Sequence, residues 1–217
     1  MNFAVEEFEP DTVGLPFGHR IPDPPPGLWV RGSQQALAMP CVAVVGARAC
    51  SPYGRTVARL IGRQLAERGY CVVSGLARGV DCEAHRGALD GGGRTVAVMA
   101  TGVDRIYPSA HGELAREILN GGGALVSEFE LGTEPAPWRF PARNRIIAGL
   151  SQALIVVEAR DVSGALIAAD FAMEAGVPVF AVPGEITCAT SRGSNRLLTQ
   201  GARPFLDIEC MKGVVEG

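Results

Sequence analysis

Short apolar runs alternate with longer segments of helical periodicity along most of the chain. The apolar runs have the length of strands and end at small or turn-forming residues, at 41–45, 71–73, 95–99, 124–126, 153–157 and 177–181. Between them, apolar side chains recur every three or four residues at 53–68, 81–89, 111–119, 144–149 and 165–175. This alternation predicts an α/β fold, a mostly parallel sheet with helices on both faces.

The first part of the chain is rich in proline and has no periodicity, ending in the run Ile21-Pro22-Asp23-Pro24-Pro25-Pro26. Such a composition is typical of an extended segment rather than of a folded domain. We therefore divide the chain into a Pro-rich N-terminal lead-in at 1–40, one domain at 41–207 and a short C-terminal tail at 208–217. A single α/β domain is ordinary for 217 residues of which 47% are apolar.

No apolar run approaches the ~20 residues that a membrane helix needs. The N-terminus is acidic and lacks the basic and then apolar order of a signal peptide. We expect a cytoplasmic protein with no membrane partner. The six cysteines form no Cys-x-x-Cys pair, and neither His85 nor His111 stands at zinc-ligand spacing from them. We expect no metal and no cofactor, and we interpret Cys41 and Cys71, at the starts of strands, as buried apolar residues.

The formal net charge of −3 argues against a nucleic-acid partner until its distribution is considered. Residues 46–203 carry 17 arginines and 15 carboxylates, so the excess of acid lies in the two ends of the chain. All but one of the 20 basic residues are arginine, whose planar fork of donors suits phosphate oxygens. An arginine-rich genome would give the same composition. The preference for arginine alone therefore does not distinguish phosphate binding from a genome-wide bias.

Small residues and a helix N-terminus follow four of the predicted strands, with an arginine in three of the four loops. The residues concerned are Gly46 and Arg48, Ser74, Gly75 and Arg78, Ser163 and Gly164, and Gly193 and Asn195. Parallel strands end at one edge of a sheet, where ligands bind, and small residues let the backbone approach an anion. One glycine after a strand is usually a turn, but four such loops predict an anionic ligand. No loop has the Gly-x-Gly-x-x-Gly or P-loop pattern of nucleotide sites.

The segment Trp138–Ser151 is unusually dense in arginine, just before a short predicted helix. It contains Arg139, Phe140, Arg143, Asn144 and Arg145. Arginine binds phosphate, and an aromatic ring offers a stacking face to an unpaired base. The alternative is that Phe140 belongs to the core and the arginines form a solvated face. We favour an anion, because cations at a helix start are otherwise disfavoured by the helix dipole.

These motifs resemble those of the DNA-processing protein A family, also called Smf, over about Arg20 to Asp207. The matching stretches are IPDPPPGLWVRG, VAVVGARACSPYGR, VVSGLARGVDCEAH, GVDRIYP, SEFELGTEP, FPARNRIIAGLS, SGALIAADFAMEAGVPVFAVPG and GSNRLLTQGA. The resemblance implies an extended Rossmann-like fold that binds single-stranded DNA in a basic pocket, forms homodimers and hands DNA to the recombinase RecA in natural transformation. By motif, the pocket would include Arg48, Arg78, Arg143, Asn144, Arg145, Ser163, Gly164, Gly193 and Asn195, with Arg139 a weaker candidate.

The sequence departs from the family pattern at several points. Ala47 and His111 stand where relatives often have serine and asparagine, and the first change could remove a hydroxyl contact. Residues 1–19 are too short for the helical domain that precedes the core in many relatives, and no winged-helix domain follows Asp207. We expect either a pared-down member or a truncated chain.

Two other classes of function compete with DNA binding. Phosphoribohydrolases of the cytokinin-activating type use a Pro-Gly-Gly-x-Gly-Thr loop and a nearby glutamate, whereas the matching stretch here, Val162–Ala168, has no acid. Glu128 and Glu158 end predicted strands and are the best remaining acids, but each is expected to pair with a nearby arginine. A pure protein-interaction module would leave the arginine loops unexplained. We therefore expect a binding protein without catalytic residues.

Overall fold

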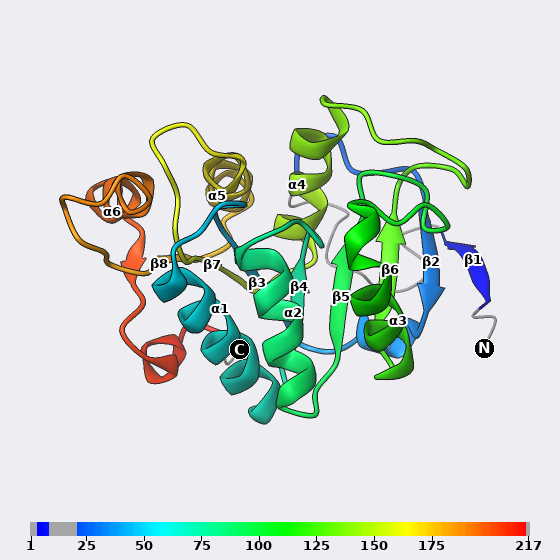
Figure 1. Ribbon diagram of the computed structural model, residues 1–217, viewed down its shortest axis with the longest axis horizontal. Coiled ribbons are helices and arrows are strands. Elements are labelled where there is room, and N and C mark those ends of the chain that lie inside the picture. Colours follow the sequence, from blue (N-terminus) through cyan, green and yellow to red (C-terminus); the bar gives the residue numbers. More distant parts are fainter. Residues whose placement is uncertain (1–3, 9–20, 216–217) are drawn as a thin grey trace.

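The computed structural model describes residues 4–8 and 21–215 and contains one mixed sheet (Figure 1). In the described chain its strand order is β1-β2-β6-β5-β4-β3-β7-β8-β9. β1 (Val5–Phe8), β2 (Leu28–Gly32) and β6 (Ala124–Ser127) pair antiparallel at one edge. All other pairs are parallel and join β6, β5 (Thr95–Val98), β4 (Cys71–Ser74), β3 (Cys41–Val45), β7 (Ala153–Val156), β8 (Val179–Ala181) and β9 (Arg203–Pro204). The predicted α/β fold with a mostly parallel sheet is confirmed.

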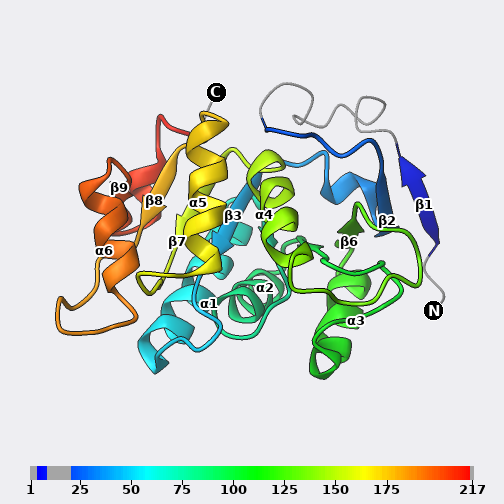
Figure 2. The same cartoon turned by 90° about the horizontal axis from the view of Figure 1, so that it is seen from above.

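Helices cover both faces of this sheet (Figure 2). One face carries α1 (Pro52–Glu67), α2 (Val80–Asp90) and α3 (Gly112–Asn120). The other carries α4 (Arg139–Gly149), α5 (Gly164–Glu174) and α6 (Arg192–Thr199). Short 3-10 helices lie at Gln34–Ala36, Ser109–His111 and Ile208–Met211. Among the described residues, no helix is long and apolar enough to cross a membrane.

The alternation of side chains along β3 shows why both faces must be covered. Cys41, Ala43 and Val45 pack in the cluster that includes α4 and α5, whereas Val42 and Val44 pack in the cluster that includes α1 and α2. Every residue of β3 is buried, as expected for a central parallel strand. The predicted burial of Cys41, and likewise that of Cys71 on β4, is confirmed.

The structure corrects and extends the elements predicted from sequence. The predicted helix at 144–149 begins five residues earlier, at Arg139, with Pro141 in its first turn. Proline is tolerated there because the first amides of a helix have no intrahelical acceptor. Among the described residues, three strands and one α-helix had not been predicted: β1, β2, β9 and α6. Residues 5–8 and 28–32 of the predicted lead-in therefore belong to the sheet, and Ile208, Met211 and Val215 of the predicted tail are buried in the core.

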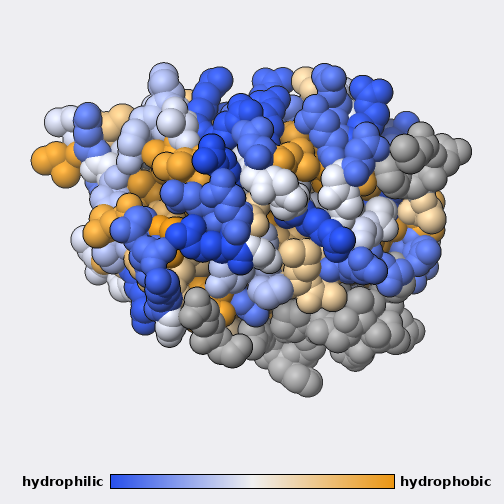
Figure 3. Space-filling view, turned by 90° about the horizontal axis from the view of Figure 1, so that it is seen from below, coloured by the Kyte–Doolittle hydropathy of each residue, from blue (hydrophilic) through white to orange (hydrophobic). Residues whose placement is uncertain are grey.

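The chain changes direction around β3, and this change positions the site. β3 lies between β4 and β7, so successive strands are added first on one side of it and then on the other. The loops after β3 and β7 consequently diverge and leave a crevice at the carboxyl edge of the sheet. This edge is at the top of Figure 1 and faces the reader in Figure 2. The opposite edge, in Figure 3, shows hydrophilic residues with smaller apolar patches between them.

Candidate functional site

A cleft of about 630 Å³ opens at the carboxyl ends of β3 and β7. The turn after β3, the loop and first turns of α5, and the first turns of α4 line it. Its charged lining residues are Arg48, Arg143, Arg160 and Asp81. With three arginines and one carboxylate, the cleft has an excess of positive charge at the place where Rossmann-like folds bind ligands.

Arg48 is exposed at the rim of the cleft, beside an aromatic ring. Its guanidinium carbon lies 4.9 Å from the centroid of the Phe140 ring, and that ring lies 5.5 Å from the ring of Tyr107. We call Arg48, Tyr107 and Phe140 the inner stack. The turn that presents Arg48 requires Gly46, because a Cβ there would come within 2.6 Å of Val80 Cγ2. The rim thus carries a cation stacked over an aromatic ring.

Arg143 is buried beneath the cleft and holds the ends of two strands together. Its Nη1 donates to the carbonyl oxygen of Gly75 at 2.8 Å and to that of Val98. A side chain at Gly75 would collide with this guanidinium. Burial lowers the pKa of Arg143 to about 10, and the Asp81 carboxylate opposes that shift. Arg143 therefore remains charged at neutral pH and contributes positive charge to the floor of the cleft.

The loop after β4 uses its own groups to satisfy its backbone. The amides of Gly75 and Ala77 donate to Asp81 Oδ2 at 3.2 and 3.4 Å. Ser74 Oγ donates to the carbonyl oxygen of Val44 at 2.7 Å, which ties β4 to β3. The small residues of this loop are thus occupied by internal bonds. Arg78 is exposed on the same loop but does not line the cleft.

Asn144 and the first residues of α5 form one wall of the cleft. Asn144 Nδ2 donates to the carbonyl oxygen of Gly164 at 2.9 Å and so connects α4 to α5. Ser163 is the N-cap of α5, and its hydroxyl accepts from the amide of Ala165 at 3.3 Å. Ser163, Gly164 and Asn144 all line the cleft, so the N-terminus of α5 and its partial positive charge lie at this wall.

Arg145 lies away from the cleft. Its two terminal nitrogens bind the two carboxylate oxygens of Glu128 at 2.6 Å each, and its Nε donates to the carbonyl oxygen of Asp23 at 2.7 Å. The side chain is almost completely buried in this ion pair. The predicted arginine partner of Glu128 is confirmed, and Arg145 has a structural role in the fold.

Gly193 and Asn195 also lie outside the cleft, around the start of α6. The amide of Gly193 donates to the carbonyl oxygen of Ala159 at 2.7 Å, and a Cβ at Gly193 would collide with the backbone of Ala159 and Arg160 in the loop after β7. The side chain of Asn195 binds both the carbonyl oxygen and the amide of Gly184, at 2.9 and 3.0 Å. Both residues fix the loops beside the cleft.

Arg139 packs against two rings on the loop before α4. Its guanidinium carbon lies 5.1 Å from the ring centroids of both Phe129 and Trp138, and its Nη1 donates to the carbonyl oxygen of Glu134. Arg139 does not line the cleft, although its neighbour Phe140 does.

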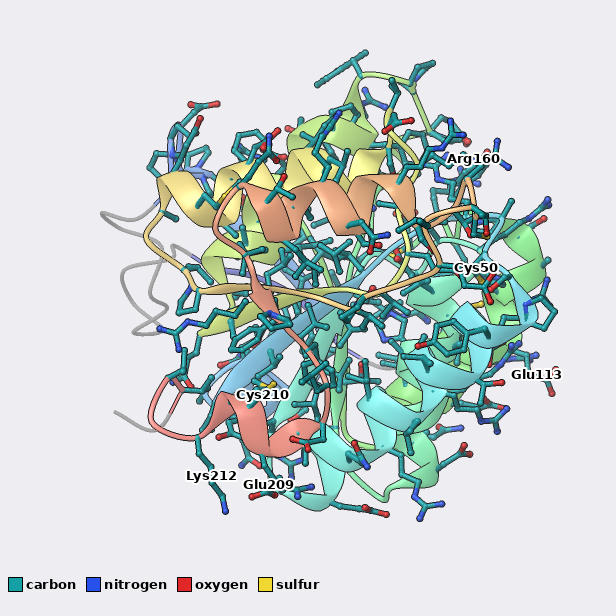
Figure 4. All side chains as sticks on the ribbon, turned by 90° about the vertical axis from the view of Figure 1, so that its left-hand side faces the viewer. Cys50, Glu113, Arg160, Glu209, Cys210 and Lys212 are labelled. Carbon is teal, nitrogen blue, oxygen red and sulfur yellow. The ribbon has the colours of Figure 1, made fainter. Side chains whose placement is uncertain are left out.

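Sequence analysis missed Arg160, which is exposed and lines the cleft (Figure 4). Its position four residues after β7 was a usable signal, because the loops after β3 and β4 also carry an arginine, Arg48 and Arg78. The expected arginine partner of Glu158 was wrong. Instead, the Glu158 carboxylate accepts from the amide and hydroxyl of Ser51, at 2.8 and 2.6 Å, at the start of α1. A negative group at a helix N-terminus is favourable because of the helix dipole.

A second cavity, of about 680 Å³, lies beside Glu158 and has the opposite electrostatic character. Its lining includes Glu158 and Glu185 but no arginine or lysine. An anionic ligand therefore fits the first cleft and not the second. A Rossmann-like sheet with a basic cleft at its change of strand order defines a class of proteins that bind phosphate-bearing ligands.

Comparison with known proteins gives the family. The family model described as DNA recombination-mediator protein A matches residues 16–215, and the chain belongs to this family. Protein Smf of Escherichia coli is 48% identical over 180 residues, which cover 83% of this chain and 48% of Smf. DNA processing protein DprA of Streptococcus pneumoniae is 45% identical over 184 residues, 84% of this chain and 64% of DprA. The chain thus spans about half to two thirds of the length of these relatives.

Solved structures of relatives agree with the fold. The X-ray structure of DprA from S. pneumoniae superposes with a TM-score of 0.85 at 40% identity, covering 94% of this chain and 71% of that one. DNA processing protein A from Helicobacter pylori also gives a TM-score of 0.85, at 31% identity, covering 96% and 94% of the two chains. The H. pylori structure is described by its unique single-stranded DNA binding mode. The family is thus one of DNA processing and recombination.

Proposed function

We propose that the cleft binds single-stranded DNA through its phosphates. The observation that carries this proposal is that two exposed arginines, Arg48 after β3 and Arg160 after β7, line one cleft together with the buried charge of Arg143. Two exposed guanidinium groups and a helix N-terminus suit successive phosphates of one strand. The name of the H. pylori relative supports the same ligand.

The inner stack favours a single strand over a duplex. Phe140 lines the cleft directly beneath the guanidinium of Arg48, so a nucleotide bound there meets a ring as well as a cation. Unpaired bases stack on such rings, whereas the bases of a duplex are already stacked on each other. Phosphate contacts and stacking carry little sequence information, so we expect binding to nearly any sequence.

The proposed cellular role follows the family. We propose that the protein protects incoming or exposed single strands in the cytoplasm and helps to load RecA on them in natural transformation and recombination. A homodimer would place two clefts on one strand. The family description as a recombination mediator supports this role and names no enzymatic activity.

The geometry gives little support to a nucleotide-processing enzyme. Both acids that could serve as a base are engaged, Glu128 by Arg145 and Glu158 by Ser51. The cleft's own carboxylate, Asp81, accepts two backbone amides. Burial raises the pKa of Asp81, although nearby arginines and these amides oppose the shift.

Fluorescence anisotropy with labelled oligonucleotides tests the proposal. We expect a single strand of ~30 nucleotides to bind more tightly than its duplex, with affinity falling steeply as salt rises, because each neutralised phosphate releases counterions. The same sample, incubated with a nucleoside monophosphate, is expected to release no free base. Equal affinity for duplex, or an affinity that does not change with salt, would refute the proposal.

A further inference from the structure

A second cluster of aromatic rings and arginine lies next to the inner stack. Phe129 and Trp138 meet edge to face, with centroids 5.8 Å apart and planes at 87°, and the Arg139 guanidinium lies 5.1 Å from both rings. We call Phe129, Trp138 and Arg139 the outer stack. It repeats the composition of the inner stack: two rings and one arginine.

The tryptophan of the outer stack is unusually exposed to solvent. Trp138 has 62% of its surface exposed, although tryptophan is one of the most buried residue types on average. Within the described chain, Arg139 Nε is buried without a hydrogen-bond partner. The free energy lost when this nitrogen is removed from water is therefore not regained from a hydrogen bond. Trp138 thus presents an exposed ring that contacts with Phe129 and Arg139 hold in place.

The outer stack is continuous with the cleft. Pro137 and Phe140 both line the cleft, and Trp138 and Arg139 lie between them at the start of α4. The loop from β6 that carries Phe129 leads directly to this point (Figure 1). The outer stack therefore borders the cleft at the N-terminal end of α4.

The charge around the outer stack indicates which part of a nucleotide it would bind. Glu130 and Glu134 are exposed on the loop between Phe129 and Trp138, and Glu134 lies 3.6 Å from Arg105. These carboxylates offset the charges of Arg139 and Arg105, so this loop attracts the phosphate backbone of a strand less than the arginines of the cleft do. A base, which has a neutral aromatic face, does not depend on this attraction and stacks on tryptophan.

We propose that the outer stack binds one unpaired base of the strand whose neighbouring nucleotides occupy the cleft. This inference rests on the proposed function and extends the path of the strand from Arg48 past Phe140 to Trp138. The contribution of the outer stack comes from stacking, so it adds affinity without adding to the number of neutralised phosphates.

Tryptophan fluorescence tests this inference directly, because the chain has only two tryptophans. Trp29 is partly buried against the core beside α3 and serves as the internal reference. In a Trp29→Phe variant, we expect oligo-dT to quench the remaining emission, in step with the anisotropy of the same titration. A Trp138→Phe variant leaves only the Trp29 emission, which we expect to remain constant.

Affinity measurements give a second readout. We expect Trp138→Ala to weaken binding of a long oligo-dT roughly 5- to 100-fold, the range for the loss of one stacked base, with an unchanged slope of affinity against salt. Trp138→Phe should restore much of the affinity. Tyr53→Ala is the matched control, since Tyr53 is 55% exposed on α1 and lines the acidic cavity.

The outcomes separate the two proposals. If the Trp29→Phe protein binds oligo-dT without a change in Trp138 emission, and Trp138→Ala binds as tightly as the native chain, the outer stack does not hold a base. That result would favour a protein partner at Trp138 and leave the cleft proposal intact. If the native chain binds no single strand at low salt, the proposed function fails and this inference fails with it.

Discussion

Arg143 and Arg145 stand two positions apart in α4, yet they contact different parts of the molecule. Arg143 binds the carbonyl oxygen of Gly75 beneath the cleft, whereas Arg145 binds the carboxylate of Glu128. Because an α-helix has 3.6 residues per turn, residues two apart point to nearly opposite sides. The motif FPARNR thus indicated the right helix, but its two arginines could not be assigned to one patch from spacing alone.

Arg143 is expected to contribute to stability as strongly as to binding. In an Arg143→Ala variant, the carbonyl groups of Gly75 and Val98 lose their donor, and the Asp81 carboxylate loses the favourable charge of the guanidinium. A buried carbonyl group left without its donor costs about 1–3 kcal/mol. Urea denaturation is expected to show this decrease in the free energy of unfolding.

Arg48→Ala provides the comparison at the residue scale. Arg48 is exposed and should change the free energy of unfolding by no more than about 0.5 kcal/mol. Equal unfolding midpoints for the Arg143→Ala and native proteins would show that the buried bonds of Arg143 contribute nothing to stability. Because its substitution is expected to leave the fold intact, Arg48 is a better residue than Arg143 for testing DNA binding.

At the scale of elements, the central strands were predictable and the edge strands were not. Continuous apolar runs such as 41–45 have no other common explanation in an α/β pattern. β9 has two residues, Arg203–Pro204, too few for any periodicity. β2 does alternate, with Leu28 and Val30 buried, but the proline run just before it indicated an extended lead-in. Loops after central strands supplied cleft-lining residues such as Arg48 and Ser163, whereas Arg160 lies between β7 and the small residues Ser163 and Gly164, which alone gave a signal in that loop.

The packing of α1 on α2 depends on glycine. A Cβ at Gly87 of α2 would collide with the backbone carbonyl group of Arg59 in α1. We expect Gly87→Ala to lower the free energy of unfolding by about 1–3 kcal/mol, because neither backbone can move without separating the helices. Chemical denaturation of the variant measures this change.

Gly112→Ala is the control for this prediction. Gly112 opens α3 with helical backbone angles, and a Cβ there would have no atom within 4 Å. This substitution should leave stability unchanged or raise it by up to about 1 kcal/mol, because alanine favours helix. If Gly87→Ala and Gly112→Ala had the same free energy of unfolding, the close contact between α1 and α2 would not explain why position 87 is glycine.

At the scale of the whole molecule, acidic residues of the described chain ends lie away from the cleft. Glu209 lies near Arg68 at the end of α1, and Figure 4 shows it at the opposite end of the molecule from Arg160. Glu6 and Glu7 lie on β1, at the edge of the sheet. The formal net charge of −3 therefore does not describe the surface that a strand would meet.

The central claim is that Arg48 and Arg160 hold phosphates of one strand in this cleft. The most direct test compares the salt dependence of single-strand affinity for the native chain, Arg48→Ala and Arg160→Ala, with Arg63→Ala as control. Arg63 is an exposed arginine of α1, paired with Glu67. We expect each cleft variant to bind about tenfold more weakly and to lower the slope of log affinity against log salt by ~0.7, the value for one phosphate of a single strand. Native affinity and native slope in both cleft variants would contradict the account.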